Sequence, residues 1–135
     1  MRILLEANVA LDVLLDRSPH ANSSAAVWAA AESGQATGLL AAHAVTTIYY
    51  LLRRQLSAEA ARRSIAALMQ VFEVAAVDAR VLREAMRAKC PDFEDAVTAA
   101  AAHAARCDFV VTRDLKGFQG SPVPAVTPAA LIPLI

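Results

Sequence analysis

Residues 2–9 read RILLEANV, an apolar run that ends on a carboxylate, Glu6, and an amide, Asn8. Consecutive apolar residues without polar alternation are typical of a strand that is buried on both faces, as the strands of a parallel sheet are. We therefore predict a buried strand at Ile3–Leu5. The polar side chains that follow it then lie at the carboxyl end of the strand, which is where parallel sheets bind their ligands.

The length and composition indicate one domain without a membrane segment. At 135 residues the chain has the size of a single domain, which we predict over residues 1–135. Hydrophobic residues make up 57% of it, but many are alanines in runs such as 99–102, which favour close helix packing. No stretch of about 18 residues lacks a charged or polar break. The start also lacks the pattern of a signal peptide, so we expect a cytoplasmic protein.

Helical and extended patterns alternate along the rest of the chain. The spacing of apolar residues and the capping signals predict helices at 20–33, 44–55, 58–72, 79–89 and 91–106, and a short helix from residue 128. Short apolar runs predict further strands at 37–41, 74–77, 109–112 and 123–126. This alternation predicts an α/β fold with a mostly parallel sheet and helices on both of its faces.

Acidic residues stand where several of these elements begin or end. Glu6 follows the first strand and Asp114 follows the strand at 109–112, so both carboxylates emerge at one edge if the two strands are parallel neighbours. Asp92 and Asp95 are three residues apart at the start of a helix and therefore share one of its faces. Three separate segments thus offer carboxylates to one crevice.

A cluster of this kind points to a hard divalent cation. Neighbouring carboxylates repel one another unless a cation compensates their charge. Oxygen donors without thiolate or imidazole suit Mg²⁺ or Mn²⁺, and such ions polarise phosphoryl oxygens and activate water for phosphodiester hydrolysis. The candidate site comprises the metal ligands Glu6, Asp95 and Asp114, the further catalytic candidates Asp92 and Thr112, and the orienting side chains Asn8 and Thr46.

Each acid also has a purely structural interpretation. Asp92 fits the N-cap of a helix, with Asp95 three residues later in the position of a capping box. Asp114 fits a turn residue before Gly117, and Glu6 fits a surface acid at a strand end. The spacing alone leaves both interpretations open.

At these residues the sequence resembles the PIN domain family, the nuclease fold of VapC-type toxins. The resemblance is carried by RILLEANVALDVLLDR (2–17), DFEDAVTAAAA (92–102) and FVVTRDLKGF (109–118), and SPVPAVTPAALI (121–132) is similar to the tail of one subgroup. It implies a three-layer α/β/α sandwich and a Mg²⁺- or Mn²⁺-dependent ribonuclease that hydrolyses RNA and is often paired with a small antitoxin protein.

The chain departs from the family pattern at two places. The first acid is usually aspartate, whereas position 6 holds glutamate. The family also commonly carries a glutamate on the helix after the second strand, but no acid lies between Glu32 and Glu59, where Thr46, Thr47 and Tyr49 are the candidates for that place. Fewer charged ligands weaken metal binding. The alternative function is therefore a catalytically weakened PIN-like domain that binds RNA or protein.

Local charge and composition suggest where partners bind. Basic and acidic residues balance at thirteen each, yet the stretch 53–89 is basic by four. Arg113 beside Asp114 is the basic residue expected nearest to a scissile phosphate, and Arg53 and Arg54 are further candidates for RNA contacts, although solvated helix faces explain them equally well. Shallow apolar faces of alanine-rich helices favour a homodimer or a bound antitoxin helix.

Two other features bear on the function class. His43, at the expected end of the strand 37–41, is a candidate proton shuttle or substitute ligand, or simply a polar residue that ends a strand. A receiver or phosphatase domain is a third class, but the chain holds no GxGxxG or GxxxxGK[ST] stretch to support phosphate handling of that kind.

Overall fold

The computed structural model describes residues 1–135 and contains one five-stranded sheet in the order β3-β2-β1-β4-β5. The strands are β1 (Arg2–Leu5), β2 (Thr37–Ala41), β3 (Glu73–Ala75), β4 (Phe109–Val111) and β5 (Ala125–Val126). In this order β1 is the central strand. All four strand pairs are parallel, which confirms the predicted α/β fold.

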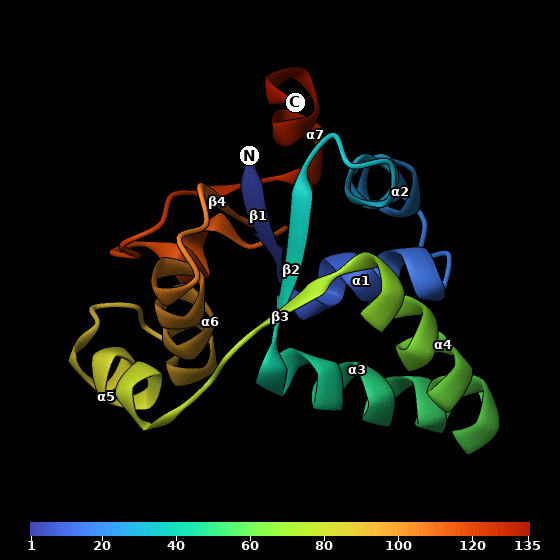
Figure 1. Ribbon diagram of the computed structural model, residues 1–135, viewed down its shortest axis with the longest axis horizontal. Helices are drawn as coiled ribbons and strands as arrows, with labels where there is room; N and C mark the ends of the chain where they lie inside the picture. The colour runs from blue at the N-terminus through green and yellow to red at the C-terminus, as the bar shows by residue number, and fades with distance from the viewer.

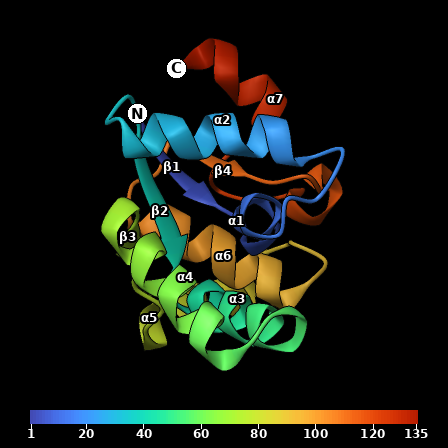
Figure 2. The same cartoon turned by 90° about the vertical axis from the view of Figure 1, so that its right-hand side faces the viewer.

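Helices cover both faces of this sheet and complete the three layers that the resemblance implied (Figure 1). On one side lie α1 (Ala7–Leu14), α2 (Ala21–Glu32), α3 (Ala42–Gln55) and α4 (Ala58–Val71), and on the other lie α5 (Ala79–Arg87) and α6 (Phe93–Ala104). The chain ends in α7 (Pro128–Leu131), which packs on α2 (Figure 2), and in a 3₁₀ turn, η2 (Ile132–Leu134). A second 3₁₀ turn, η1 (Leu115–Phe118), follows β4. None of the helices is both long enough and apolar enough to cross a membrane.

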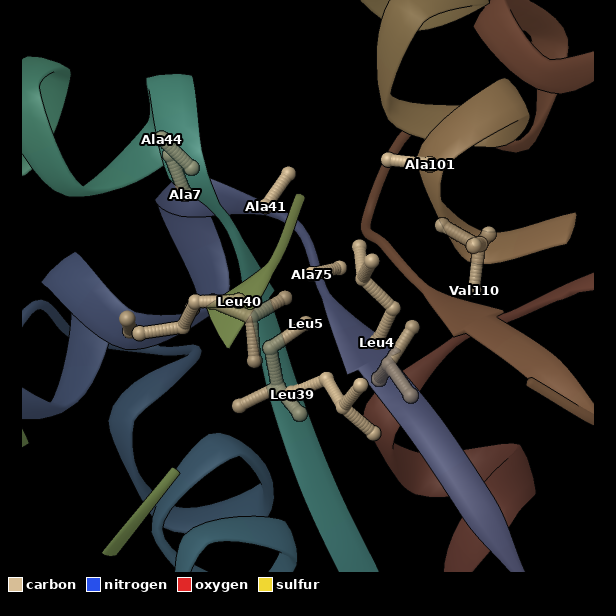
Figure 3. Close-up of a cluster of buried hydrophobic side chains, with 14 of the residues drawn as sticks. Leu4, Leu5, Ala7, Leu39, Leu40, Ala41, Ala44, Ala75, Ala101 and Val110 are labelled. Atoms are coloured by element: carbon tan, nitrogen blue, oxygen red, sulfur yellow. The ribbon is translucent and has the colours of Figure 1, made fainter. Parts of the chain in front are cut away.

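The central strand is buried because helices pack on both sides of it. Ile3, Leu4 and Leu5 are fully buried, as the run of apolar residues predicted. Figure 3 shows Leu4 and Leu5 beside the side chains of Leu39 and Leu40 from β2, within the main core cluster. Small alanines on the helices, such as those at the start of α1 and in α6, let the helices approach the sheet closely.

The main difference from the predicted elements is α1, which follows β1 directly. Its sequence, ANVALDVL, is mostly apolar and has no capping side chain before it. The sequence therefore shows no signal that a helix begins directly after the strand. The helix forms because α2 and α3 pack against it. The sequence patterns left the residues between Glu6 and Arg17 without an assigned element, and the structure places residues 7–14 in a largely buried helix.

Smaller differences concern the ends of elements near the polar edge. The helix α3 begins at Ala42, so His43 lies in its first turn and does not end a strand. The strand β4 ends at Val111, one residue before Thr112, and the expected loop after it contains η1. Helix boundaries of this kind depend on tertiary hydrogen bonds that a sequence pattern does not specify.

Gly38 in β2 lies in close contact with Phe72, which follows α4, and with Ala31 in α2. A Cβ atom there would lie 2.6 Å from a ring carbon of Phe72 and 2.8 Å from the Cβ of Ala31. Distances this short cannot be tolerated without movement of the neighbours. The residue is therefore glycine for lack of space.

We predict that Gly38→Ala lowers the free energy of unfolding by about 1–3 kcal/mol, because the added methyl overpacks the core. Urea denaturation measures this loss. If the clash is with the ring, Phe72→Leu in the same chain should recover part of it, so that the double variant is more stable than the sum of the two single losses implies. Strictly additive losses would contradict the steric explanation.

Candidate functional site

The pairing of β1 with β4 brings two of the candidate acids to one edge of the sheet. Leu5 lies opposite Val111 in the parallel register, and the N–H of Glu6 donates to the carbonyl of Val111 at 2.9 Å. Glu6 therefore leaves β1 at the same level at which the chain leaves β4. Asp114 follows three residues after this bond, in the segment that leads into η1.

The third segment is the start of α6, where Asp92 and Asp95 have different roles. Asp92 is the N-cap, and its Oδ1 accepts a hydrogen bond from the N–H of Asp95 at 3.1 Å. The structural interpretation of Asp92 is thus confirmed. The reciprocal bond of a capping box, from the N–H of Asp92 to the carboxylate of Asp95, is not formed. The carboxylate of Asp95 is therefore not used by its own helix.

Asp95 and Asp114 converge above Gly117. A Cβ atom placed on Gly117 would lie 2.5 Å from Oδ2 of Asp95 and 2.9 Å from Oδ2 of Asp114. The two carboxylates thus point at one small volume, which any side chain at position 117 would fill. Glycine leaves that volume free.

The segment that carries Asp114 is held by short local hydrogen bonds. Thr112 is fully buried, and its Oγ1 accepts a bond from the N–H of Asp114 at 3.0 Å. Oδ1 of Asp114 accepts a bond from the N–H of Gly117 at 3.3 Å and caps η1, as its interpretation as a turn residue predicted. Thr112 was predicted either to orient a water molecule or to support the ligands from behind, and its burial and its bond to Asp114 fit the second role.

The electrostatics show that these carboxylates repel one another. Burial raises the pKa of Glu6, and the charges of Asp95 and Glu94 raise it further, while hydrogen bonds from Asn8 act in the opposite direction. Burial, followed by the charges of Asp92, Asp114 and Glu94, raises the pKa of Asp95 from 3.8 to about 6. Negative charges from its own helix start and from the segment of Asp114 thus both act on Asp95.

These features suit a cation, although the ligand group is not closed in this structure. No three side chains of the types His, Cys, Asp and Glu lie close enough together to hold a metal ion. Two carboxylate oxygens do converge at Gly117, and Glu6 is close enough for its charge to interact with that of Asp95. An all-oxygen set with unneutralised negative charge is the donor chemistry of Mg²⁺ or Mn²⁺.

The orienting residues predicted from the sequence divide into one near the acids and one away from them. Asn8 lies beside Glu6, since its backbone and side chain both donate hydrogen bonds that lower the pKa of that carboxyl. Thr46 donates to the carbonyl of His43 at 2.8 Å within α3, and no contact joins it to an acid. The hydroxyl of Thr46 is thus used within its own helix, and its orienting role stays a prediction.

The three basic candidates do not face the acid cluster. The guanidinium of Arg113 is directed to the fully buried Asp12, with Nε donating to Oδ2 at 2.8 Å and Nη2 to Oδ1 at 3.2 Å. Arg53 and Arg54 lie in the last turn of α3, about 15 Å along the helix axis from His43. The guanidinium of Arg113 is thus already paired within the protein, and its contact with a scissile phosphate stays a prediction.

Two polar residues differ from the sequence prediction: His43 lies in a helix and not at the end of a strand, and Asp12 was not among the predicted site residues. Nε2 of His43 lies 3.3 Å from Oγ1 of Thr98, one turn after Asp95, while its Nδ1 is buried without a partner. Burial lowers the pKa of His43, and the nearby charge of Glu94 opposes that shift. Asp12 went unnoticed, although a lone acid within the apolar run VALDVLL (9–15) is the signal of a buried, paired charge.

The family of the chain follows from its sequence. The family profile described as PIN domain matches residues 2–116, which is most of the chain. The chain belongs to the PIN domain family, as its three motifs indicated. No curated protein is similar enough in sequence to match it.

Solved structures of this fold resemble the chain in architecture. One such structure is VapBC2 from Rickettsia felis, which was solved bound to a fragment of its promoter DNA. A chain of it has a TM-score of 0.73 at 14% identity, with 94% of this chain and 98% of that chain covered. FitAcB from Neisseria gonorrhoeae has a TM-score of 0.69 at 21% identity, with 94% and 98% covered. VapC20 from Mycobacterium tuberculosis, a toxin that cleaves the sarcin-ricin loop, has a TM-score of 0.65 at 18% identity, with 80% and 86% covered. At these identities the likeness is one of fold.

The capping role of Asp92 predicts how its substitutions affect stability. Asp92→Ala should lower the free energy of unfolding by about 1 kcal/mol, because the N–H of Asp95 loses its acceptor. Asp92→Ser should recover most of that loss, since a hydroxyl accepts the same bond. Denaturation at neutral pH in the presence of a chelator measures both. Equal losses in the two variants would show that the cap is not the source.

The raised pKa of Asp95 predicts an unusual pH dependence of the metal-free protein. Because this pKa is about 6 in the folded protein against an ordinary 3.8, the folded state binds more protons between these values, and stability falls as the pH rises through them. Asp95→Asn should remove this dependence and stabilise the metal-free protein at pH 7.5 by about 1 kcal/mol, after a discount for solvent screening.

Thermal melts in chelator at several pH values measure this effect. Asp16→Asn is the matched control, because Asp16 is exposed and its positive φ of 49° suits asparagine. This variant should keep the wild-type dependence. A wild-type protein that gains stability between pH 4 and 6 as strongly as Asp95→Asn does would contradict the assignment.

Proposed function

We propose that this chain is a Mg²⁺- or Mn²⁺-dependent endoribonuclease that hydrolyses phosphodiester bonds of RNA in the cytoplasm. The observation that carries the proposal is the convergence of Asp95 and Asp114 above Gly117, at the edge where Glu6 leaves β1. Membership of the PIN domain family supports it, and so does the fold shared with VapC20, which cleaves the sarcin-ricin loop.

In this proposal Asp95, Asp114 and Glu6 would hold the metal, and the other polar residues would support them. A bound Mg²⁺ or Mn²⁺ supplies polarisation of a phosphoryl oxygen and activation of water. Thr112 fixes the main chain of Asp114, Asn8 directs hydrogen bonds at Glu6, and Asp92 sets the first turn of α6. Burial and then the neighbouring acids raise the pKa of Asp95, and a bound cation would offset the repulsion among those acids.

We further propose that the chain forms a homodimer and is held by a small antitoxin protein. Several proteins that share its fold were solved as VapBC or FitAB assemblies bound to DNA. The alanine-rich helices and exposed apolar residues such as Leu56, Met69 and Met86 supply surface for such contacts. Co-expression with the product of an adjacent small gene, followed by size-exclusion chromatography, tests this part.

The nuclease proposal predicts cleavage of RNA that requires Mn²⁺ or Mg²⁺ and stops when a chelator is added. The products should carry 5′-phosphate and 3′-hydroxyl ends. Asp95→Asn should lower kcat by about 100-fold or more, because a lost metal ligand costs several kcal/mol. Asp16→Asn should cleave like the wild type. Cleavage that survives both the chelator and Asp95→Asn would come from a contaminant or from another site.

A second candidate function is a PIN domain that binds RNA or protein without cleaving it. The lack of a closed group of three metal-binding side chains favours it, as do Glu6 in place of aspartate and the absence of an acid from α3. Calorimetric titration with Mn²⁺ separates the two candidates. Binding at millimolar ion or tighter supports the nuclease, whereas RNA binding without metal binding supports the second candidate.

A further inference from the structure

Asp12 is a buried acid at the junction of four segments. It lies in α1, is fully buried, and its carboxylate receives bonds or ion pairs from Ser24 in α2, from Arg17 after α1 and from Arg113 after β4. Two guanidinium groups therefore share one desolvated carboxylate. Both arginines keep about a third of their side-chain surface exposed.

One arm of this network reaches the segment of Asp114. Both carboxylate oxygens of Asp12 accept bonds from Arg113, at 2.8 and 3.2 Å, in the paired geometry that fixes a guanidinium in orientation as well as distance. The neighbour of Arg113 on one side, Thr112, is anchored in the sheet by a bond from its N–H to the carbonyl of Val126 at 2.9 Å. The main chain that presents Asp114 is thus held from the sheet and from Asp12.

The other arm reaches Glu6. Nε of Arg17 lies 3.0 Å from Oδ1 of Asp12 in an ion pair that lacks hydrogen-bond geometry, and the backbone N–H of Arg17 donates to the Asp12 carbonyl at 3.0 Å. Nη2 of Arg17 then donates to the carbonyl of Asn8 at 3.1 Å and to its Oδ1 at 3.4 Å. Arg17 thus holds both the main chain and the side-chain oxygen of Asn8, which lies two residues after Glu6 at the start of α1.

We propose that Asp12 is a positioning residue that locks the two segments carrying Glu6 and Asp114 in a common frame through Arg17 and Arg113. This proposal rests on the proposed function, whose metal would lie between those carboxylates. Asp12 itself touches neither substrate nor metal. Asp12 fixes the positions of the segments of Glu6 and Asp114 relative to each other. Asp95 is not part of this network, because it lies in α6, on the face of the sheet opposite to α1.

The chemistry of burial explains why an acid does this work. A carboxylate without water must be paired, and losing one partner is strongly unfavourable, so the two arginines have little freedom to leave. An apolar residue at position 12 would fill the space but would leave Arg17 and Arg113 free to turn to solvent. Groups that orient metal ligands from behind typically change metal affinity or activity by about 10–100-fold when they are removed.

The test uses three variants that cut the network at different places. Asp12→Asn keeps the shape and removes the charge that holds both arms. Arg113→Gln cuts only the arm to Asp114, and Arg17→Gln cuts only the arm to Asn8, so both leave Asp12 one arginine if Asp12→Asn does not fold. Arg2→Gln is the matched control, because Arg2 pairs with Glu73 at the opposite end of β1.

Two measurements report on positioning, the first in the metal-free protein and the second on addition of Mn²⁺. The first is amide hydrogen exchange by NMR at Asp114, Gly117 and Asn8, compared with core amides of β1. The second is the Mn²⁺ dissociation constant from calorimetry, accompanied by kcat and KM for a short RNA. All are taken well below the melting temperature of each variant.

We expect Asp12→Asn to speed exchange at Asp114, Gly117 and Asn8 while the core amides stay protected, and to weaken Mn²⁺ binding by about tenfold. Its kcat should fall while KM changes little. Arg113→Gln should affect only Asp114 and Gly117, and Arg17→Gln only Asn8. Unchanged local exchange and Mn²⁺ affinity in folded variants, with only a lower melting temperature, would overturn the proposal and leave Asp12 a structural residue.

A failure of the proposed function looks different in the same experiment. If the wild-type protein neither binds Mn²⁺ nor cleaves RNA, the metal-dependent nuclease is wrong. The exchange data still decide whether Asp12 holds the segments of Glu6 and Asp114 together, because that measurement needs no metal.

Discussion

The parallel pairing of β1 with β4 is the constraint on which the polar edge depends. Neither acid that flanks these strands is near the other in the sequence, yet the register that sets Leu5 opposite Val111 fixes both segments at one level of the sheet. The bond from the Glu6 N–H to the Val111 carbonyl is the last rung of this ladder. Because both strands are covered by helices, a shift of register would expose apolar side chains, so the core itself enforces the alignment of the acids.

The negative charges of Asp12 and of Asp95 have opposite surroundings, since the first is paired with cations of the protein and the second is not. Around Asp12 a buried negative charge meets two guanidinium groups and a hydroxyl, so the cluster is internally compensated. Around Asp95 negative charges gather without a cation from the protein, and the pKa of that carboxyl rises to about 6. Sites that are electrostatically unfavourable by themselves are typical of places where a ligand supplies the missing charge. The paired cluster gives the rigid support that the repelling cluster lacks.

The departures from the family pattern take on a clearer meaning in this setting. The longer side chain of Glu6 starts from a backbone that is held by the sheet and is directed by Asn8, so its carboxyl stays close enough to feel the charge of Asp95. In α3, where an acid is missing, the first turn instead offers His43, whose ring reaches Thr98 on α6. The side chain that faces α6 from this helix is therefore a weakly basic ring and not a carboxylate.

The amino-acid sequence by itself determined the α/β class, the strands, most helices and the set of acids at the polar edge. These follow from local signals, since apolar runs, helical spacing and capping residues act over a few positions of the chain. It also indicated that Asp92 and Asp114 had structural alternatives, and both residues do cap the turns that follow them.

Only the tertiary structure decided α1, the convergence of Asp95 and Asp114 over Gly117, and the direction of the Arg113 side chain. Each of these depends on residues that lie far apart in the chain: the packing of α2 and α3 on α1, the approach of α6 to η1, and a bond between residues 12 and 113. Charge pairing and burial act across space, and a single sequence read in order does not specify which distant partner a buried charge will find.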